Sequence, residues 1–101
     1  MRNEIHKIEN LENLQRLKVL NLGKNRISRI QGLQYCQSLE KLILSHQRTK
    51  NTLTFEQDSL IGISQNLVYL DLENNRINAV HELGFLPYID YLNLKDNLIE
   101  S

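Results

Sequence analysis

Leucines, one asparagine and further aliphatic residues recur at fixed spacing between residues 67 and 83. In chain order they are Leu67, Leu70, Leu72, Asn75, Ile77, Val80 and Leu83. Apolar and polar residues alternate over residues 69–72, which predicts a short strand with Leu70 and Leu72 pointing inward. The three-residue spacing that follows Ile77 favours a tight helical turn on the opposite side. The pattern therefore predicts a unit made of a strand, a polar corner and a short helical segment.

The polar corner stands where the chain turns away from the predicted strand. Asn75 carries both an amide donor and a carbonyl acceptor, so its buried side chain can satisfy backbone groups that the turn leaves without partners. Asn25 and Asn97 occupy the same place in other copies of the pattern, and Gln47 occupies it in a fourth copy. Because glutamine offers the same groups on a longer stem, we expect Gln47 to reach the corner too.

The same spacing divides the whole chain of 101 residues. Residues 17–38 and 67–88 are complete copies, whereas residues 1–16 match only the end of a copy and residues 89–101 only its beginning. Residues 39–66 form a copy with six extra residues, for which we expect a longer covering segment. In it, Asp58 and Ser59 could cap a short helix running from Leu60 to Ile63. We therefore expect one domain whose ends lack full caps.

Copies with this spacing resemble the 22-residue subclass of leucine-rich repeats. The resemblance implies an α/β fold, a right-handed leucine-rich-repeat solenoid of about four repeats, with short parallel strands on the concave face and 3₁₀ or α segments on the convex face. The irregular copy is further similar to one in the testis-enriched, tubulin-associated leucine-rich regulatory subunits of protein phosphatase 1. The residues that carry this similarity are Gln47, Arg48, Phe55, Asp58, Leu60 and Ser64. It implies a phosphatase-regulatory, ciliary or cytoskeletal role.

Stacked parallel strands would align equivalent outward side chains in rows about 5 Å apart. Aromatic anchors inside a polar rim are typical of recognition surfaces. The candidate protein-binding residues of the concave face are Val19, Asn21, Lys41, Ile43, Tyr69, Asp71, Glu73, Tyr91, Asn93 and Lys95. The alternative interpretation is that these residues are ordinary strand formers, because adjacent tyrosines also stabilise neighbouring strands.

Charge and composition narrow the function classes. Twelve basic residues balance twelve acidic ones, which argues against a general binder of nucleic acid or anionic membranes. With neither a signal peptide nor a membrane-spanning run in the sequence, we expect a cytoplasmic protein, in a cilium or on the cytoskeleton if the resemblance holds. The single cysteine, Cys36, falls at an apolar position of its copy, so we expect a small buried hydrophobe rather than a reactive thiol.

Patterns for catalysis or metal binding are weak. The three histidines lie in different copies without a second ligand at helical spacing. The four glycines are isolated, form no phosphate loop and are interpreted as turn residues. A nucleophile elbow is also missing, so we expect no enzyme activity, no cofactor and no metal. We interpret Arg26, Arg29, Arg48 and Arg76 as part of a solvated face.

Two functions remain open at this point. The favoured one is a non-catalytic module that binds a protein partner through its concave sheet. For that partner, the resemblance implies a phosphatase catalytic subunit or a tubulin or dynein component. The alternative is a truncated structural fragment that forms a homodimer through its uncapped ends, because open strand edges and exposed inward leucines are unfavourable in water.

Overall fold

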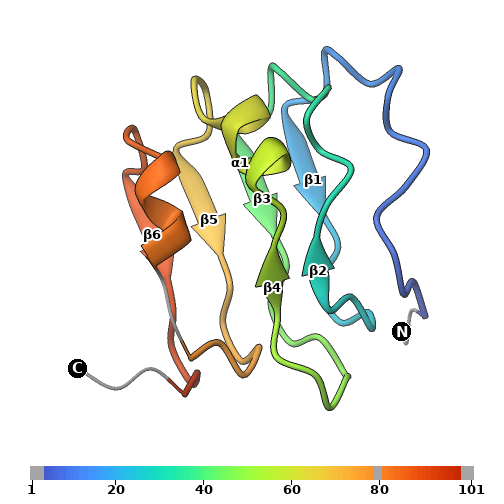
Figure 1. Ribbon diagram of the computed structural model, residues 1–101, viewed down its shortest axis with the longest axis vertical. Coiled ribbons are helices and arrows are strands. Elements are labelled where there is room, and N and C mark those ends of the chain that lie inside the picture. Colours follow the sequence, from blue (N-terminus) through green and yellow to red (C-terminus); the bar gives the residue numbers. More distant parts are fainter. Residues whose placement is uncertain (1–3, 79–80, 99–101) are drawn as a thin grey trace.

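Four short strands form one parallel sheet in the order β1-β3-β5-β6 (Figure 1). The structure, a computed structural model, describes residues 4–78 and 81–98, so Val80 of the repeat pattern lies outside the described residues. The strands are β1 (Val19–Asn21), β3 (Lys41–Ile43), β5 (Tyr69–Asp71) and β6 (Tyr91–Asn93). They lie where apolar and polar residues alternate, as the sequence predicted.

The strand register aligns equivalent positions of the four copies. Leu20, Leu42, Leu70 and Leu92 form one row across the sheet. Leu42 and Leu70, in the middle of the row, are fully buried, whereas Leu92 on the outermost strand is 41% exposed. The two ends of the row therefore differ in solvent exposure from its middle.

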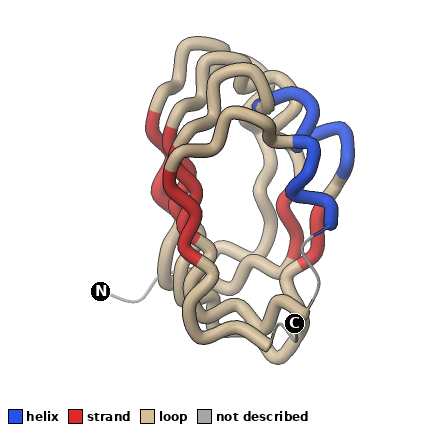
Figure 2. Tube along the Cα trace, turned by 90° about the vertical axis from the view of Figure 1, so that its left-hand side faces the viewer, coloured by secondary structure: helices blue, strands red, loops and turns tan. Residues whose placement is uncertain are grey.

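In the described residues, the side opposite this sheet carries two further strands and two helices, and Figure 2 shows these helices across from the sheet. Strand β2 (Arg29–Ile30) pairs in parallel with β4 (Thr54–Phe55). Helix α1 (Gln57–Ile63) follows β4, and the 3₁₀ helix η1 (His81–Phe85) lies in the next copy. The sequence predicted only helical segments on this side, so the paired strands β2 and β4 were not expected. The long second copy runs beside the first, where the N–H of Glu56 reaches the carbonyl oxygen of Ile30 at 2.8 Å.

Helix α1 begins earlier than the sequence predicted. Its N-cap is Glu56, not Asp58 or Ser59, and no side chain caps it. Ser59 is buried inside the helix, where its hydroxyl donates to Glu56 Oε1 at 2.7 Å and accepts from the N–H of Leu33 at 3.0 Å. The expected cap is thus wrong, because Ser59 serves to join the helix to the preceding copy.

Gly62 allows the same helix to lie close to the preceding copy. A Cβ atom at this position would lie 2.5 Å from the Cα and the carbonyl oxygen of Gln34. From the sequence, Gly62 was interpreted as a turn residue. That interpretation is wrong, because Gly62 lies inside α1 and allows close packing. Gly32 does need left-handed backbone, with φ of +71°.

The apolar core fills the space between the two sheets. Cys36 belongs to it and is fully buried, as the sequence predicted, and this burial raises the pKa of its thiol. Ile8 is also buried, so the first described residues cover part of the β1 edge. Within the described residues, no helix is long and apolar enough to cross a membrane. The largest fully buried side chains are Ile27, Ile30, Leu33, Leu39, Leu42, Leu44, Leu60, Ile63, Leu67, Leu70, Leu72 and Ile77.

The corner amides bond to the main chain of neighbouring copies. Asn75 is 3% exposed, and its Nδ2 donates to the carbonyl oxygens of Leu44 and Leu72 at 2.7 and 3.1 Å. Its Oδ1 accepts from the N–H of Gln47 at 3.1 Å. Asn97 repeats the arrangement, because its Oδ1 accepts from the N–H of Asn75 at 2.8 Å. Each described corner is therefore tied to the copy before it.

Gln47 reaches the corner despite its longer side chain, as the sequence predicted. Its Nε2 donates to the carbonyl oxygens of Leu22 and Leu44 at 2.7 and 3.1 Å, as the Asn75 amide does one copy later. Its Oε1 accepts from the N–H of Ile27 at 2.8 Å. Asn97 makes the equivalent bond two copies further on, because its Oδ1 also accepts from the N–H of Ile77 at 2.9 Å. The longer glutamine stem therefore preserves this contact between copies.

The residue before each corner adopts left-handed backbone. Lys24, His46, Asn74 and Asp96 have φ values of 59°, 58°, 59° and 58°. Asn, Asp and His adopt this conformation more readily than Lys does. Among these four residues, the repeated turn therefore holds Lys24 in a less favourable conformation.

Candidate protein-binding face

The strand register places the ten candidate residues on one side of the four-stranded sheet, here called the exposed sheet face. One row consists of Val19, Lys41, Tyr69 and Tyr91, and the next of Asn21, Ile43, Asp71 and Asn93. Glu73 and Lys95 follow β5 and β6, where main-chain bonding continues from the N–H of Asn74 to the carbonyl oxygen of Lys95 at 2.9 Å. The rows are those that the sequence predicted.

Three side chains of the first row stack across neighbouring strands. The rings of Tyr69 and Tyr91 are 4.3 Å apart between centroids and inclined by 16°. Lys41 Nζ lies 4.3 Å from the centroid of the Tyr69 ring. Stacked rings and a cation over a ring both stabilise the pairing of these strands. The ring faces that touch therefore fit the alternative interpretation, in which adjacent tyrosines stabilise neighbouring strands. Tyr91 still exposes 43% of its surface, which remains open to a partner.

Polar side chains of the second row shape the ends of the strands. The side-chain oxygens of Asn21, Asp71 and Asn93 each accept the main-chain N–H two residues later, at 3.0, 3.1 and 3.0 Å. Such bonds are typical of Asx turns. The Oδ1 atom of each side chain is thus used in the local turn. The second polar atom, Nδ2 or Oδ2, can bind groups across the face, as Asn93 Nδ2 does with Glu73.

Negative charge gathers at the β5–β6 end of the face. Glu73 Oε1 accepts from Asn93 Nδ2 at 3.0 Å, and its Oε2 lies 4.0 Å from His46 Nε2. Burial is the largest cause of the raised pKa of Tyr91; Tyr69 and the charges of Asp71 and Glu73 raise it further. His46 is not among the ten candidate residues, although its place just before a corner residue puts it at the exit of its strand, close to Glu73.

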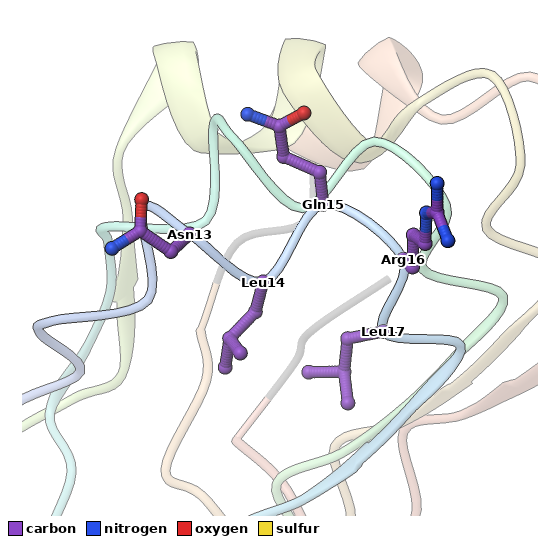
Figure 3. A pocket seen from close by; sticks show the side chains of 5 residues that line it. All are labelled: Asn13, Leu14, Gln15, Arg16 and Leu17. Carbon is purple, nitrogen blue, oxygen red and sulfur yellow. The ribbon is translucent and has the colours of Figure 1, made fainter.

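Hollows on the described surface lie near its N-terminal end, and one of them is lined by Ile5, Lys7, Ile8, Glu9, Leu11, Leu20 and Leu22. A hollow ahead of β1 is lined by the consecutive residues 13–17, and in Figure 3 its two leucine side chains extend away from Gln15 and Arg16. Catalytic sites usually combine residues from distant segments. Within residues 4–78 and 81–98, no group of three or more His, Cys, Asp or Glu side chains is placed to hold a metal ion.

Comparison with known proteins relates the chain to leucine-rich-repeat proteins. No family model matches it. It is 34% identical over 103 residues to U2 small nuclear ribonucleoprotein A′ of Arabidopsis thaliana, a match that covers 92% of this chain and 40% of that protein. It is 35% and 37% identical to the follicle-stimulating hormone receptors of Felis catus and Homo sapiens, covering 81% and 82% of this chain.

The chain spans only a part of each of these relatives, 40% of the plant protein and 12% of each receptor. Both kinds of relative are leucine-rich-repeat proteins. The short parallel strands, the few helices and the aligned leucine rows fit an α/β fold of that type. Sequence similarity and architecture both support a leucine-rich-repeat protein.

Proposed function

We propose that the chain is a non-catalytic interaction module that binds a protein partner through the exposed sheet face. The observation that carries this proposal is the strand register, which lines up the outward side chains of four strands on one open surface. That surface presents apolar area at its two ends, where Val19 is 53% and Tyr91 43% exposed. Charged side chains of Lys41, Asp71 and Glu73 lie between and beside them. Aromatic and apolar anchors with a polar surround favour protein recognition.

The relatives and the sequence resemblance bear on the kind of partner in different ways. By their names, the relatives are a component of a small nuclear ribonucleoprotein and receptors of a hormone. The resemblance of the irregular copy to phosphatase regulatory subunits supports a phosphatase catalytic subunit, tubulin or dynein component as the partner, in the cytoplasm or a cilium. We further propose that the four strands belong to a right-handed solenoid of about four repeats, in which this face is concave.

The test removes the aromatic pair from the exposed sheet face. Tyr69→Ala combined with Tyr91→Ala should abolish binding to purified phosphatase catalytic subunit or tubulin, whichever the parent protein binds, in biolayer interferometry. The matched control combines Tyr35→Ala with Tyr88→Ala, because these tyrosines are 48% and 56% exposed outside the sheet. The control should bind like the parent.

Circular dichroism of both double variants separates binding from folding. If the sheet-face variant keeps the parent spectrum and still binds like the parent, the partner uses another surface. If the parent binds neither the phosphatase catalytic subunit nor tubulin, the partner assignment is wrong. The binding face would then be tested with other proteins.

A second function, self-association, is favoured by the exposed end of the sheet. Strand β6 lies at the end of the strand order; Leu92 within it is 41% exposed, and Leu98, which follows it in the chain, is 59% exposed. Exposed apolar groups on an edge strand favour pairing with another chain. Light scattering should then show a mass that rises with concentration and falls in Leu92→Lys. A constant monomer mass would contradict this second function.

A further inference from the structure

The balanced total charge hides an uneven distribution along the chain. Residues 1–50 contain ten Lys or Arg and four Asp or Glu, whereas residues 51–101 contain two and eight. By copy, residues 1–38 carry seven Lys or Arg and three Asp or Glu, residues 39–66 three of each, and residues 67–101 two and six. The strands follow one another across the sheet in chain order, so the β1 side of the molecule is basic, the copy with β3 is neutral, and the β5 and β6 side is acidic (Figure 1).

The same polarity is present on the exposed sheet face. Lys41 on β3 lies on one side, and Asp71 on β5 with Glu73 just beyond it lies on the other. At the acidic end, Lys95 and His46 are the basic groups of the described residues, and His46 lies 4.0 Å from Glu73. Lys41 directs its charge onto the Tyr69 ring. The acidic end thus keeps carboxylate charge available to a partner.

The aromatic stack ends at this acidic side. One face of the Tyr91 ring rests on Tyr69, and β6 is the outermost strand of the sheet. The opposite ring face is therefore directed toward the open edge, where Tyr91 is 43% exposed. Lys41 over Tyr69 already shows, within this chain, how a cation sits on the stack. A second cation over Tyr91 would gain from the ring and from the nearby carboxylates together.

We infer that the partner of the exposed sheet face is a basic protein segment, bound with an Arg or Lys side chain over Tyr91 beside Asp71 and Glu73. This inference rests on the proposed function, because it assigns the chemistry of the partner at the same face. Apolar residues of the segment would extend toward Val19 and Ile43. Charge complementarity fixes its direction, with its basic end over β5 and β6.

The experiment compares two short peptides by isothermal titration calorimetry at low salt. One carries arginines at one end and leucines at the other, and the second has glutamates in place of the arginines. The arginine peptide should bind more tightly, and added salt should weaken it because exposed charge pairs are screened. Equal binding of the two peptides, or tighter binding of the glutamate peptide, would overturn the inference.

Two isosteric changes test the carboxylates themselves. Asp71→Asn with Glu73→Gln keeps the oxygens that accept from the N–H of Glu73 and from Asn93, so the fold should persist. Loss of two exposed charge pairs should lower the affinity for the arginine peptide about fivefold. Asp58→Asn, an exposed change on α1, is the matched control and should have little effect.

The two proposals fail in different ways. If Tyr69→Ala with Tyr91→Ala abolishes binding of the native partner while Asp71→Asn with Glu73→Gln does not, the face binds but its partner is not basic. If neither double variant changes binding, the face itself is not used. A mass that doubles at working concentration in light scattering, with no peptide bound, would assign the face to a second copy of the chain.

Discussion

At the scale of single residues, the corner amides show how one polar side chain holds two copies together. An asparagine in the core would be costly without partners, but Asn75 bonds through both its donor and its acceptor. Gln47 does the same from a longer side chain. The sequence predicted this role because an amide offers a fixed set of groups, whereas the main-chain atoms that each amide reaches depend on how neighbouring copies stack.

Asn75→Leu should lower the free energy of unfolding by about 1–3 kcal/mol, because buried main-chain groups of the corner lose their hydrogen-bond partners. Asn97→Leu, at a less buried corner, should cost less. Urea denaturation of the two variants and the parent measures the difference. Equal stability of Asn75→Leu and the parent would show that the buried groups find other partners.

Glu56 makes a pH-dependent contribution to stability. The hydrogen bond from the Ser59 hydroxyl, followed by the one from the N–H of Gly32, holds the pKa of Glu56 below its ordinary value of 4.5. A carboxyl group with a lowered folded-state pKa stabilises the fold above its unfolded pKa, and this stabilisation disappears as pH falls through the folded pKa. Below about pH 4.5, the parent should therefore lose stability faster than Glu56→Gln. Urea midpoints of both proteins between pH 7 and 3 test this, and parallel curves would contradict it.

At the scale of elements, the four strands of the main sheet were predictable from the sequence, and the β2–β4 pair on the opposite side was not. The positions of β1, β3, β5 and β6 follow from strict alternation, which depends only on local geometry. Strand pairing between β2 and β4 joins residues 25 positions apart across a copy of irregular length, which no period encodes. The early start of α1 and the stack of Lys41, Tyr69 and Tyr91 likewise depend on contacts between copies.

Gly62→Ala should destabilise the protein by about 1–3 kcal/mol, because its methyl group would collide with the backbone of Gln34. This loss should exceed the gain in helix propensity of about 1 kcal/mol. Gly84→Ala is the matched control, since a Cβ atom there would have no neighbour within 4 Å. Thermal unfolding compares the two. A Gly62→Ala variant as stable as Gly84→Ala would mean that α1 can move away from the preceding copy.

At the scale of the whole molecule, burial is greatest in the middle of the sheet. Leu42 and Leu70 are fully buried, whereas Leu92 at the end of the same row is 41% exposed. In an array where each unit contacts only its neighbours, an end unit is held from one side and opens more easily. The exposed end and the uneven charge are both consequences of stacking the copies in chain order.

Amide hydrogen exchange should reveal this gradient in two chemically matched bonds. The N–H of Leu44 donates to Asp71, and that of Leu72 to Asn93, both at 2.9 Å. The first bond lies one strand further from the β6 end, so the Leu44 amide should exchange at least about tenfold more slowly. Equal rates would indicate that the sheet opens only as a whole.

The stacked tyrosines have a further use. The chain contains no tryptophan and four tyrosines, and two of the four lie face to face on the proposed binding surface. Their ultraviolet emission is therefore an intrinsic, label-free signal from the region where we expect a partner to dock. A change in that signal during a titration would follow occupancy directly, without any alteration of the protein.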